Sequence, residues 1–267
     1  MNGMLLGNGR TADVFAYDTG CIIKLFKTFM NNDFIDNEFA IASFAYQNRL
    51  PTPQPVSKVI QNERTGLIYT RIEGESLLKT LSKNPFKMSI IARKMALLHY
   101  QINSIEYKNS KSFQKKNIEN AIKSVSCLSS TEKDKIIQHL SSLPEGNVLC
   151  HGDFHPDNIL INDKIWIIDW MTGSSGNPGC DVARSKMILE NSDIPETVSP
   201  AIRYLLKLGQ KKLASKYVSE YCKVSGLKKI DINKWLLPLY ASRLTESLSE
   251  NEKAHILRKI KKEMSKG

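Results

Sequence analysis

Short apolar runs separated by turn residues dominate the first seventy positions of the chain. Five such runs predict strands, at residues 4–6, 14–17, 21–26, 56–60 and 66–71. Gly7-Asn8-Gly9 and Asp18-Thr19-Gly20 divide the first three runs, and glycine-containing turns of this kind join antiparallel strands. The pattern therefore predicts a small antiparallel sheet at the start of the chain.

Apolar residues at helical spacing form a second pattern, which dominates after residue 74. It predicts helices over 34–47, 86–104, 113–125 and 131–142, and a helical segment from 179 to 267 with breaks at Pro195, Pro200, Gly226 and Pro238. The proline-rich stretch 48–55 is expected to be an extended connector. Two apolar runs, 159–161 and 165–169, flank a polar turn and predict a short buried hairpin that ends in Asp169.

Together the two patterns indicate an α+β protein of two lobes. We expect a small lobe at residues 1–73, made of an antiparallel sheet with one helix. A larger, mostly helical lobe is expected at residues 74–267. The chain of 267 residues is long enough for two such lobes that share a cleft.

The composition, with 41% hydrophobic and 24% charged residues, is that of an ordinary globular protein. No apolar stretch approaches the roughly 20 residues of a membrane span, and the first residues do not resemble a secretion signal. The five cysteines are scattered and form no Cys-x-x-Cys pair, which is typical of reduced thiols rather than of a disulfide framework or a zinc site. We therefore expect a cytoplasmic protein with no membrane partner.

The formal net charge of +11 raises the question of nucleic-acid binding. The basic residues are dispersed, however, and the densest cluster, at 258–262, lies in the helical tail. No nucleic-acid-binding motif accompanies them. We expect a solvated basic surface that favours anionic small ligands such as ATP, and no nucleic-acid partner.

The strongest candidate chemistry lies in residues 151–158, His-Gly-Asp-Phe-His-Pro-Asp-Asn, and in Asp169 eleven residues later. Phosphoryl transfer needs a carboxylate to accept a proton and oxygen ligands for Mg²⁺ beside the ATP phosphates. Asp153 could be the first, and Asn158 with Asp169 could be the second. Each could instead be an ordinary turn residue, but the order of loop, hairpin and terminal acid favours the functional interpretation.

A second group of candidates lies in the strand-rich region. Gly7-Asn8-Gly9 lies between two predicted strands, where its backbone could cover a phosphate or form a plain hairpin turn. Lys24 interrupts an apolar strand, so it could be exposed by alternation or could reach the phosphates of a nucleotide. A phosphate-binding lysine needs a carboxylate to orient it, and Glu38 on the next helix is the best placed, although Asp33 and Asp36 are near in sequence.

Two residues are expected to support the 151–158 loop rather than to react. His151 and His155 lie on a loop with Pro156, which does not present two imidazoles to one metal ion, so we expect His151 to hydrogen-bond the loop backbone. Asp181 opens a predicted helix, where it could stabilise orphan N–H groups or fix the catalytic loop. These two roles of Asp181 are compatible.

These parts occur in the order found in the aminoglycoside phosphotransferase/choline kinase family, which the chain resembles. The residues that carry the resemblance are Gly7-Asn8-Gly9, Ile23-Lys24, Glu38, residues 151–158, Ile168-Asp169-Trp170 and residues 177–184. The resemblance implies a bilobal, protein-kinase-like fold that binds ATP and Mg²⁺. The chain departs from the pattern at Ala12, which replaces a third loop glycine, and at Trp170-Met171, which follow Asp169 where protein kinases have Phe-Gly.

The resemblance also implies roles for individual residues. By match, Asp153 would be the catalytic aspartate, and Asn158 and Asp169 would be the Mg²⁺ ligands. The nucleotide-binding residues would be Gly7, Asn8, Gly9, Lys24, Glu38, Arg71 and Ile72. The last two belong to the segment whose backbone would meet adenine, and His151 and Asp181 would support the catalytic loop.

The resulting prediction is an ATP- and Mg²⁺-dependent phosphotransferase that moves the γ-phosphate to a hydroxyl of a small molecule. The alternative is a pseudokinase-like module that binds nucleotide without turnover. The acceptor could be a sugar, an amino alcohol, another metabolite or an antibiotic. A polycationic aminoglycoside would need an acidic pocket, for which the candidates are Glu190, Asp193 and Glu196, and Glu246, Glu250 and Glu252. Because these acids could equally be solvated helix ends, aminoglycosides rank below the other acceptors.

Overall fold

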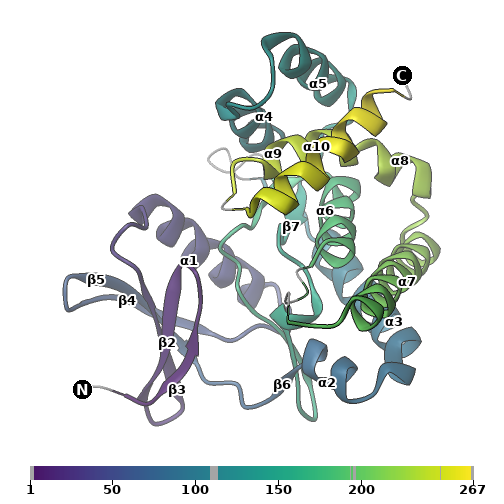
Figure 1. Cartoon of the computed structure of the whole chain (residues 1–267). Helices are drawn as coiled ribbons and strands as arrows, with labels where there is room; N and C mark the ends of the chain where they lie inside the picture. Colours follow the sequence, from purple (N-terminus) through teal and green to yellow (C-terminus); the bar gives the residue numbers. More distant parts are fainter. Residues whose placement is uncertain (1–2, 109–113, 193, 195–196, 247, 266–267) are drawn as a thin grey trace. The chain divides into compact units, whose positions relative to one another are not determined.

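The computed structural model describes residues 3–108, 114–192, 194, 197–246 and 248–265 (Figure 1). The chain divides into two compact units, each built from two stretches of sequence. The first unit combines Met1–Pro85 with Pro156–Gly173, and the second combines Phe86–His155 with Ser174–Gly267. The sequence suggested a single boundary at 73/74, whereas the structure groups the later segment 156–173 with the amino-terminal region.

The first unit contains a five-stranded antiparallel sheet with the order β1-β2-β3-β5-β4. Its strands are β1 (Leu5–Asn8), β2 (Ala12–Asp18), β3 (Cys21–Phe26), β4 (Pro55–Gln61) and β5 (Arg64–Thr70). All five predicted strands are therefore confirmed. Ile23 and Leu25 of β3 are buried with Ile68 of β5. Because side chains alternate along a strand, Lys24 points to the opposite face from these two core residues.

Pro55 is the first residue of β4, although the sequence placed it in the connector before the strand. A proline can begin an edge strand because its missing N–H removes no ladder bond there. The connector itself is confirmed as non-helical. Its residue Thr52 donates a hydrogen bond to the carbonyl oxygen of Ile167 at 2.9 Å.

One helix, α1 (Asn32–Gln47), accompanies this sheet and packs on β4 and β5. Asn31 caps it by accepting a hydrogen bond from the Asp33 N–H at 2.9 Å. The buried face of α1 consists of Ile35, Glu38, Ile41, Ala42 and Ala45. Glu38 therefore lies on the apolar stripe, which turns its carboxylate inward.

A second, three-stranded sheet in the first unit has the order β6-β8-β9. It consists of β6 (Glu75–Ser76), β8 (Ile159–Ile161) and β9 (Ile165–Ile167). The short helix α2 (Leu77–Lys83) follows β6, and the 3-10 helix η2 (Pro156–Asn158) precedes β8. The predicted hairpin is confirmed, but β9 ends at Ile167 rather than at Asp169. The reason is that Asp169 has a φ of 65°, which is incompatible with an extended strand.

The second unit is mostly helical. Its helices are α3 (Met88–Asn103), α4 (Gln114–Ser124), α5 (Ser130–Ser142), α6 (Pro178–Glu190), α7 (Pro200–Ser225), α8 (Lys229–Lys234), α9 (Leu236–Arg243) and α10 (Glu250–Met264). Another 3-10 helix, η1 (Pro85–Lys87), precedes α3. Helices α3 and α7 lie side by side (Figure 1). Two strands that the sequence did not predict, β7 (Val148–Cys150) and β10 (Ser174–Gly176), pair antiparallel.

Only some of the predicted helix breaks coincide with helix ends in the structure. Gly226 ends α7 with a φ of 76°, as expected of a glycine C-cap. Pro200 begins α7, and Pro238 lies in the first turn of α9, so the interruption falls at Trp235 instead. A proline is tolerated in the first turn because the N–H it lacks would have no helical partner there. Pro195 lies outside the described residues.

Within the described residues, no helix is long and apolar enough to cross a lipid bilayer.

Candidate active site

A cavity of about 670 Å³ lies within the first unit. Strand β3 contributes Lys24 to its wall, and α1 contributes Glu38. Asn158 and Asp169 come from the two ends of the hairpin segment. The cavity therefore collects four polar candidates whose positions in the sequence range from 24 to 169.

Lys24 is the centre of this polar group. Its Nζ lies 2.8 Å from Glu38 Oε1, 2.9 Å from Glu38 Oε2 and 2.8 Å from Asp169 Oδ1. Burial alone would lower the pKa of Lys24, but the carboxylates of Glu38 and Asp169 outweigh it and hold the pKa above its ordinary value. Lys24 is therefore a permanent cation, and Glu38 is the carboxylate that orients it.

Glu38 has a second partner that the sequence did not reveal. The hydroxyl of Tyr69, which also lines the cavity, donates a hydrogen bond to Glu38 Oε1 at 3.1 Å. Burial raises the pKa of Glu38, and the ammonium of Lys24 only partly offsets this effect. Tyr69 stands in an apolar run of β5, so its sequence context is that of an ordinary core aromatic. Only the structure shows that its hydroxyl reaches Glu38.

Asp169 has a strained backbone. Its φ of 65° lies in the left-handed region, which costs a residue other than glycine about 1–3 kcal/mol. Neighbouring bonds hold this turn: the Ile168 N–H donates to the Asn158 carbonyl oxygen at 3.0 Å, and Trp170 Nε1 donates to Thr52 Oγ1 at 2.9 Å. Such strain persists only where surrounding structure fixes it, and it is concentrated at functional sites.

Of the Gly7-Asn8-Gly9 stretch, only Gly7 lines the cavity. The Asn8 side chain donates to Asp13 Oδ1 at 2.9 Å, and the Gly9 N–H donates to the Ala12 carbonyl oxygen at 2.9 Å. The Gly9 amide thus closes the β1–β2 turn. Arg71 and Ile72 both line the cavity.

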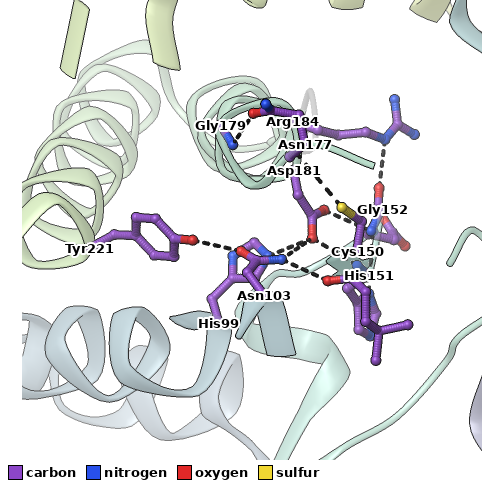
Figure 2. A network of polar contacts seen from close by, with 12 residues as sticks. His99, Asn103, Cys150, His151, Gly152, Asn177, Gly179, Asp181, Arg184 and Tyr221 are labelled. Carbon is purple, nitrogen blue, oxygen red and sulfur yellow. Dashed lines mark hydrogen bonds and ion pairs between the residues drawn. The ribbon is translucent and has the colours of Figure 1, made fainter. Parts of the chain in front are cut away.

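In the second unit, Asp181 organises the loop that begins at His151 (Figure 2). Its Oδ2 accepts a hydrogen bond from the His151 N–H at 2.8 Å, and its Oδ1 accepts one from the Gly152 N–H at 2.8 Å. Oδ2 also contacts His99 Nε2 at 2.8 Å and accepts from Asn103 Nδ2 at 3.1 Å. Burial would raise the pKa of Asp181, but His99 and the two backbone donors hold it well below its usual range.

Four residues around Asp181 escaped the sequence analysis. They are His99 and Asn103 of α3, and Tyr217 and Tyr221 of α7. His99 Nδ1 lies 2.5 Å from the Tyr217 hydroxyl, and the Tyr221 hydroxyl donates to Asn103 Oδ1 at 2.8 Å. The available signal was the spacing of His99 and Asn103, four residues apart on the otherwise apolar face of α3.

Asp153 lies within the same loop. Its N–H donates to His151 Nδ1 at 3.3 Å, and its Oδ2 lies 3.4 Å from His155 Nε2. Burial would raise the pKa of Asp153, but His155 and Arg184 outweigh it and lower the pKa to about 2. Asp153 is consequently ionised at neutral pH and can accept a hydrogen bond from a hydroxyl.

The oxygen atoms of Asn158 and Asp169 match the preference of Mg²⁺ for carboxylate and carbonyl ligands. Mg²⁺ in phosphotransferases is usually held by one or two protein ligands together with phosphates and water. Among the described residues, no three His, Cys, Asp or Glu side chains gather around a possible metal position. The donor set therefore fits Mg²⁺ held jointly with a phosphate group better than a metal held by protein alone.

Comparison with known proteins extends this picture. Residues 4–211 match the family model described as the phosphotransferase enzyme family. No curated protein sequence matches the chain.

Solved structures with the same fold include three kinds of kinase. The ADP-bound aminoglycoside phosphotransferase APH(2'')-Ib is 16% identical with a TM-score of 0.61, over 96% of this chain and 90% of that one. A fructosamine-3-kinase homologue from Haemophilus somnus is 13% identical with a TM-score of 0.62, over 96% and 90%. A choline/ethanolamine kinase family protein from Mesorhizobium loti is 12% identical with a TM-score of 0.52, over 94% and 83%.

These similarities confirm the expected α+β, protein-kinase-like fold. The family model spans more than three quarters of the chain, including every candidate residue from Gly7 to Asp181. The chain therefore belongs to the phosphotransferase enzyme family.

Proposed function

We propose that the protein transfers the γ-phosphate of ATP, with Mg²⁺, to a hydroxyl group of a small molecule. The observation that carries this proposal is a cavity of the first unit lined by Lys24, Glu38, Asn158 and Asp169, in which Lys24 contacts Glu38 and Asp169. This is the set of groups that cradles a nucleoside triphosphate and its metal in kinases. Among the structures with this fold, APH(2'')-Ib is bound to ADP, and APH(2'')-IIa forms a ternary complex with ATP and streptomycin.

In this proposal Lys24 binds the nucleotide phosphates, and Glu38 keeps its ammonium pointed into the cavity. The backbone near Gly7 lies over the phosphates, and that of Arg71 and Ile72 faces the base. A cavity of about 670 Å³ is in the range of pockets for ligands of this size. Asn8 and Gly9 then act by shaping the turn rather than by lining the cavity.

Asn158 and Asp169 are proposed to hold Mg²⁺, which neutralises negative charge on the phosphates when it is bound. Lys24 Nζ lies 2.8 Å from Oδ1 of Asp169, one of these two proposed ligands. Lys24 is thus a cation beside the proposed metal ligand, and its contact orients the Asp169 carboxylate. The residues of the protein supply alignment and charge neutralisation, which is most of what phosphoryl transfer requires.

Asp153 is proposed to accept the proton of the acceptor hydroxyl. With a pKa of about 2, its carboxylate is a weak base. A weak base suffices in a loose, metaphosphate-like transition state, because the hydroxyl becomes acidic only as its bond to phosphorus forms. Asp153 therefore orients the hydroxyl first and takes the proton late.

The acceptor is proposed to be a sugar, an amino alcohol or another metabolite rather than a polycationic antibiotic. The described acids that could attract a polycation are engaged with the protein's own cations, in the pairs Glu190–Lys186, Glu246–Arg184, Glu250–Lys253 and Glu252–Arg243. The other two candidates, Asp193 and Glu196, lie outside the described residues. These internal pairs support an acceptor without a high positive charge.

Replacing Asp153 by Asn tests the proposal. We expect Asp153→Asn to lower kcat for Mg²⁺-dependent ATP turnover by about a hundredfold or more, with ATP affinity retained, because only proton transfer and orientation are lost. The measurement is phosphate release together with nucleotide binding by calorimetry. Unchanged turnover would show that Asp153 is not the base, and nucleotide binding without any turnover in the wild type would favour the pseudokinase alternative.

A further inference from the structure

Gly152, the residue just before Asp153, is held at both its backbone N–H and its backbone carbonyl group. The Gly152 N–H donates to Asp181, as described above, and the Gly152 carbonyl oxygen accepts a hydrogen bond from Arg184 Nε at 2.6 Å (Figure 2). Gly152 has a φ of 77°, a conformation open to glycine at no steric cost. The orientation of Asp153 therefore depends on where the Arg184 guanidinium stands.

Arg184 is itself fixed from the other side by Glu246. Arg184 Nη2 donates a hydrogen bond to Glu246 Oε1 at 3.0 Å. Since a guanidinium is planar and rigid, holding Nη2 on Glu246 fixes the direction in which Nε points. The two bonds together fix the Arg184 side chain in the orientation in which Nε donates to the Gly152 carbonyl oxygen.

Glu246 in turn has an anchored position. It lies in the turn that follows α9, where its N–H donates to the Arg243 carbonyl oxygen at 3.0 Å. Arg243 Nε lies 3.5 Å from Glu246 Oε2, and Arg243 Nη2 lies 3.7 Å from Glu252 Oε1. Glu252 forms the capping box of α10 with Ser249. A row of alternating charges thus connects the start of α10 to Gly152.

We propose that Glu246 is a positioning residue for phosphoryl transfer, acting through Arg184 on the Gly152–Asp153 peptide. This inference rests on the proposed function of Asp153. Glu246 lies beyond residues 4–211 that match the family model, so the role belongs to the carboxy-terminal part of this chain. It also gives Glu246 a task other than attracting a cationic acceptor.

The test compares Glu246→Ala and Glu246→Gln with Glu250→Gln in the full-length protein. Glu250 is a matched control because its side chain is 90% exposed and pairs only with Lys253 in the described contacts. In Glu246→Ala we expect kcat for Mg²⁺-ATP turnover to fall about tenfold or more while KM for ATP changes less than about twofold. Glu246→Gln, which keeps an acceptor for Nη2, should lie in between, and Glu250→Gln should match the wild type.

Hydrogen exchange provides a measurement that does not depend on activity. The backbone amides of residues 151–153 should exchange several-fold faster in Glu246→Ala than in Glu250→Gln, because Arg184 no longer holds the loop closed. Equal exchange in these two variants would overturn the inference, whether or not the wild type turns over ATP. Absence of turnover in the wild type would instead refute the proposed function and leave the exchange result to decide the role of Glu246.

A double-mutant cycle separates positioning from general stability. If Glu246 acts through Arg184, Glu246→Ala should add little to the loss of kcat and the gain in loop exchange caused by Arg184→Ala. Additive losses would overturn the inference, since they would mean that the two residues act independently.

Discussion

At the scale of single residues, the candidate site depends on two buried carboxylates with different tasks. Glu38 has a cation, Lys24, and a hydroxyl, Tyr69, as partners in the first unit. Asp181 has backbone and side-chain donors in the second. In both cases a charge removed from water is compensated by specific partners, which makes the loss of any one partner costly.

We expect Asp181→Asn to reduce the free energy of unfolding by about 3 kcal/mol at neutral pH, because the amide cannot accept all the donors that surround the carboxylate. Urea unfolding followed by circular dichroism measures this difference. A loss below about 0.5 kcal/mol would show that the donors find other partners.

The same variant has a defined pH dependence. Since the pKa of Asp181 is lowered by folding, its ionised form contributes stability above the unfolded-state pKa of about 3.9, and this contribution is lost as pH falls below that value. The difference in stability between wild type and Asp181→Asn should therefore be constant from about pH 7 to pH 5 and shrink below about pH 4. A difference that grows on acidification would contradict this sign.

At the scale of elements, helix α7 illustrates how glycines act differently at two positions. Gly226 ends the helix with a left-handed φ of 76°. Gly209 lies inside the helix, and a Cβ added there would meet only Met88 Cε, at 3.9 Å. Gly226 is needed for its left-handed backbone conformation. Gly209 has no such requirement, and its main effect is to give the unfolded chain more conformational freedom.

We expect Gly226→Ala to destabilise the protein by about 1 kcal/mol, because alanine is strained in the left-handed region. Gly209→Ala should stabilise it by roughly 0.5–1 kcal/mol, because alanine favours a helix interior and costs less backbone entropy. Thermal unfolding of both variants measures these opposite shifts. A loss of stability in Gly209→Ala would indicate that Met88 cannot accommodate the added methyl group.

At the scale of the whole molecule, the course of the chain matters more than its composition. The segment Pro156–Gly173 leaves the helical part of the sequence and folds with the amino-terminal region. It thereby brings Asn158 and Asp169 into the cavity that Lys24 and Glu38 line. The polar groups proposed to bind nucleotide and metal thus belong to one compact unit, despite their separation in sequence.

Nucleotide binding should therefore stabilise the protein. With Mg²⁺ and a non-hydrolysable ATP analogue at 100 times its dissociation constant, we expect about 2.7 kcal/mol of added stability, seen as a rise in Tm. Lys24→Met should lose most of this rise, because the phosphates lose their cation, whereas Glu250→Gln should retain it. An equal rise in Lys24→Met would show that the nucleotide binds without contacting Lys24. The same assay with candidate acceptors added can identify the second substrate.

The elements of this fold followed closely from local sequence. Period-two and helical patterns predicted the five-stranded sheet, α1 and the hairpin at 159–167, because each buries one apolar face that repeats along the chain. The exceptions have local reasons as well. Strand β9 stops at Ile167 because Asp169 is left-handed, and β7 and β10 are three residues each, too short for a periodic pattern.

The sequence by itself determined the order of the chemical groups: a glycine turn, a strand lysine, a helical glutamate, and the loop from His151 to Asn158 followed by Asp169. These are local motifs, which can be recognised in the sequence and which carry its resemblance to a known family. Only the tertiary structure decided their partners, such as Asp169 for Lys24, His99 for Asp181 and Glu246 for Arg184. Those contacts join residues 62 to 145 positions apart, and packing, rather than any local pattern, brings such distant residues together.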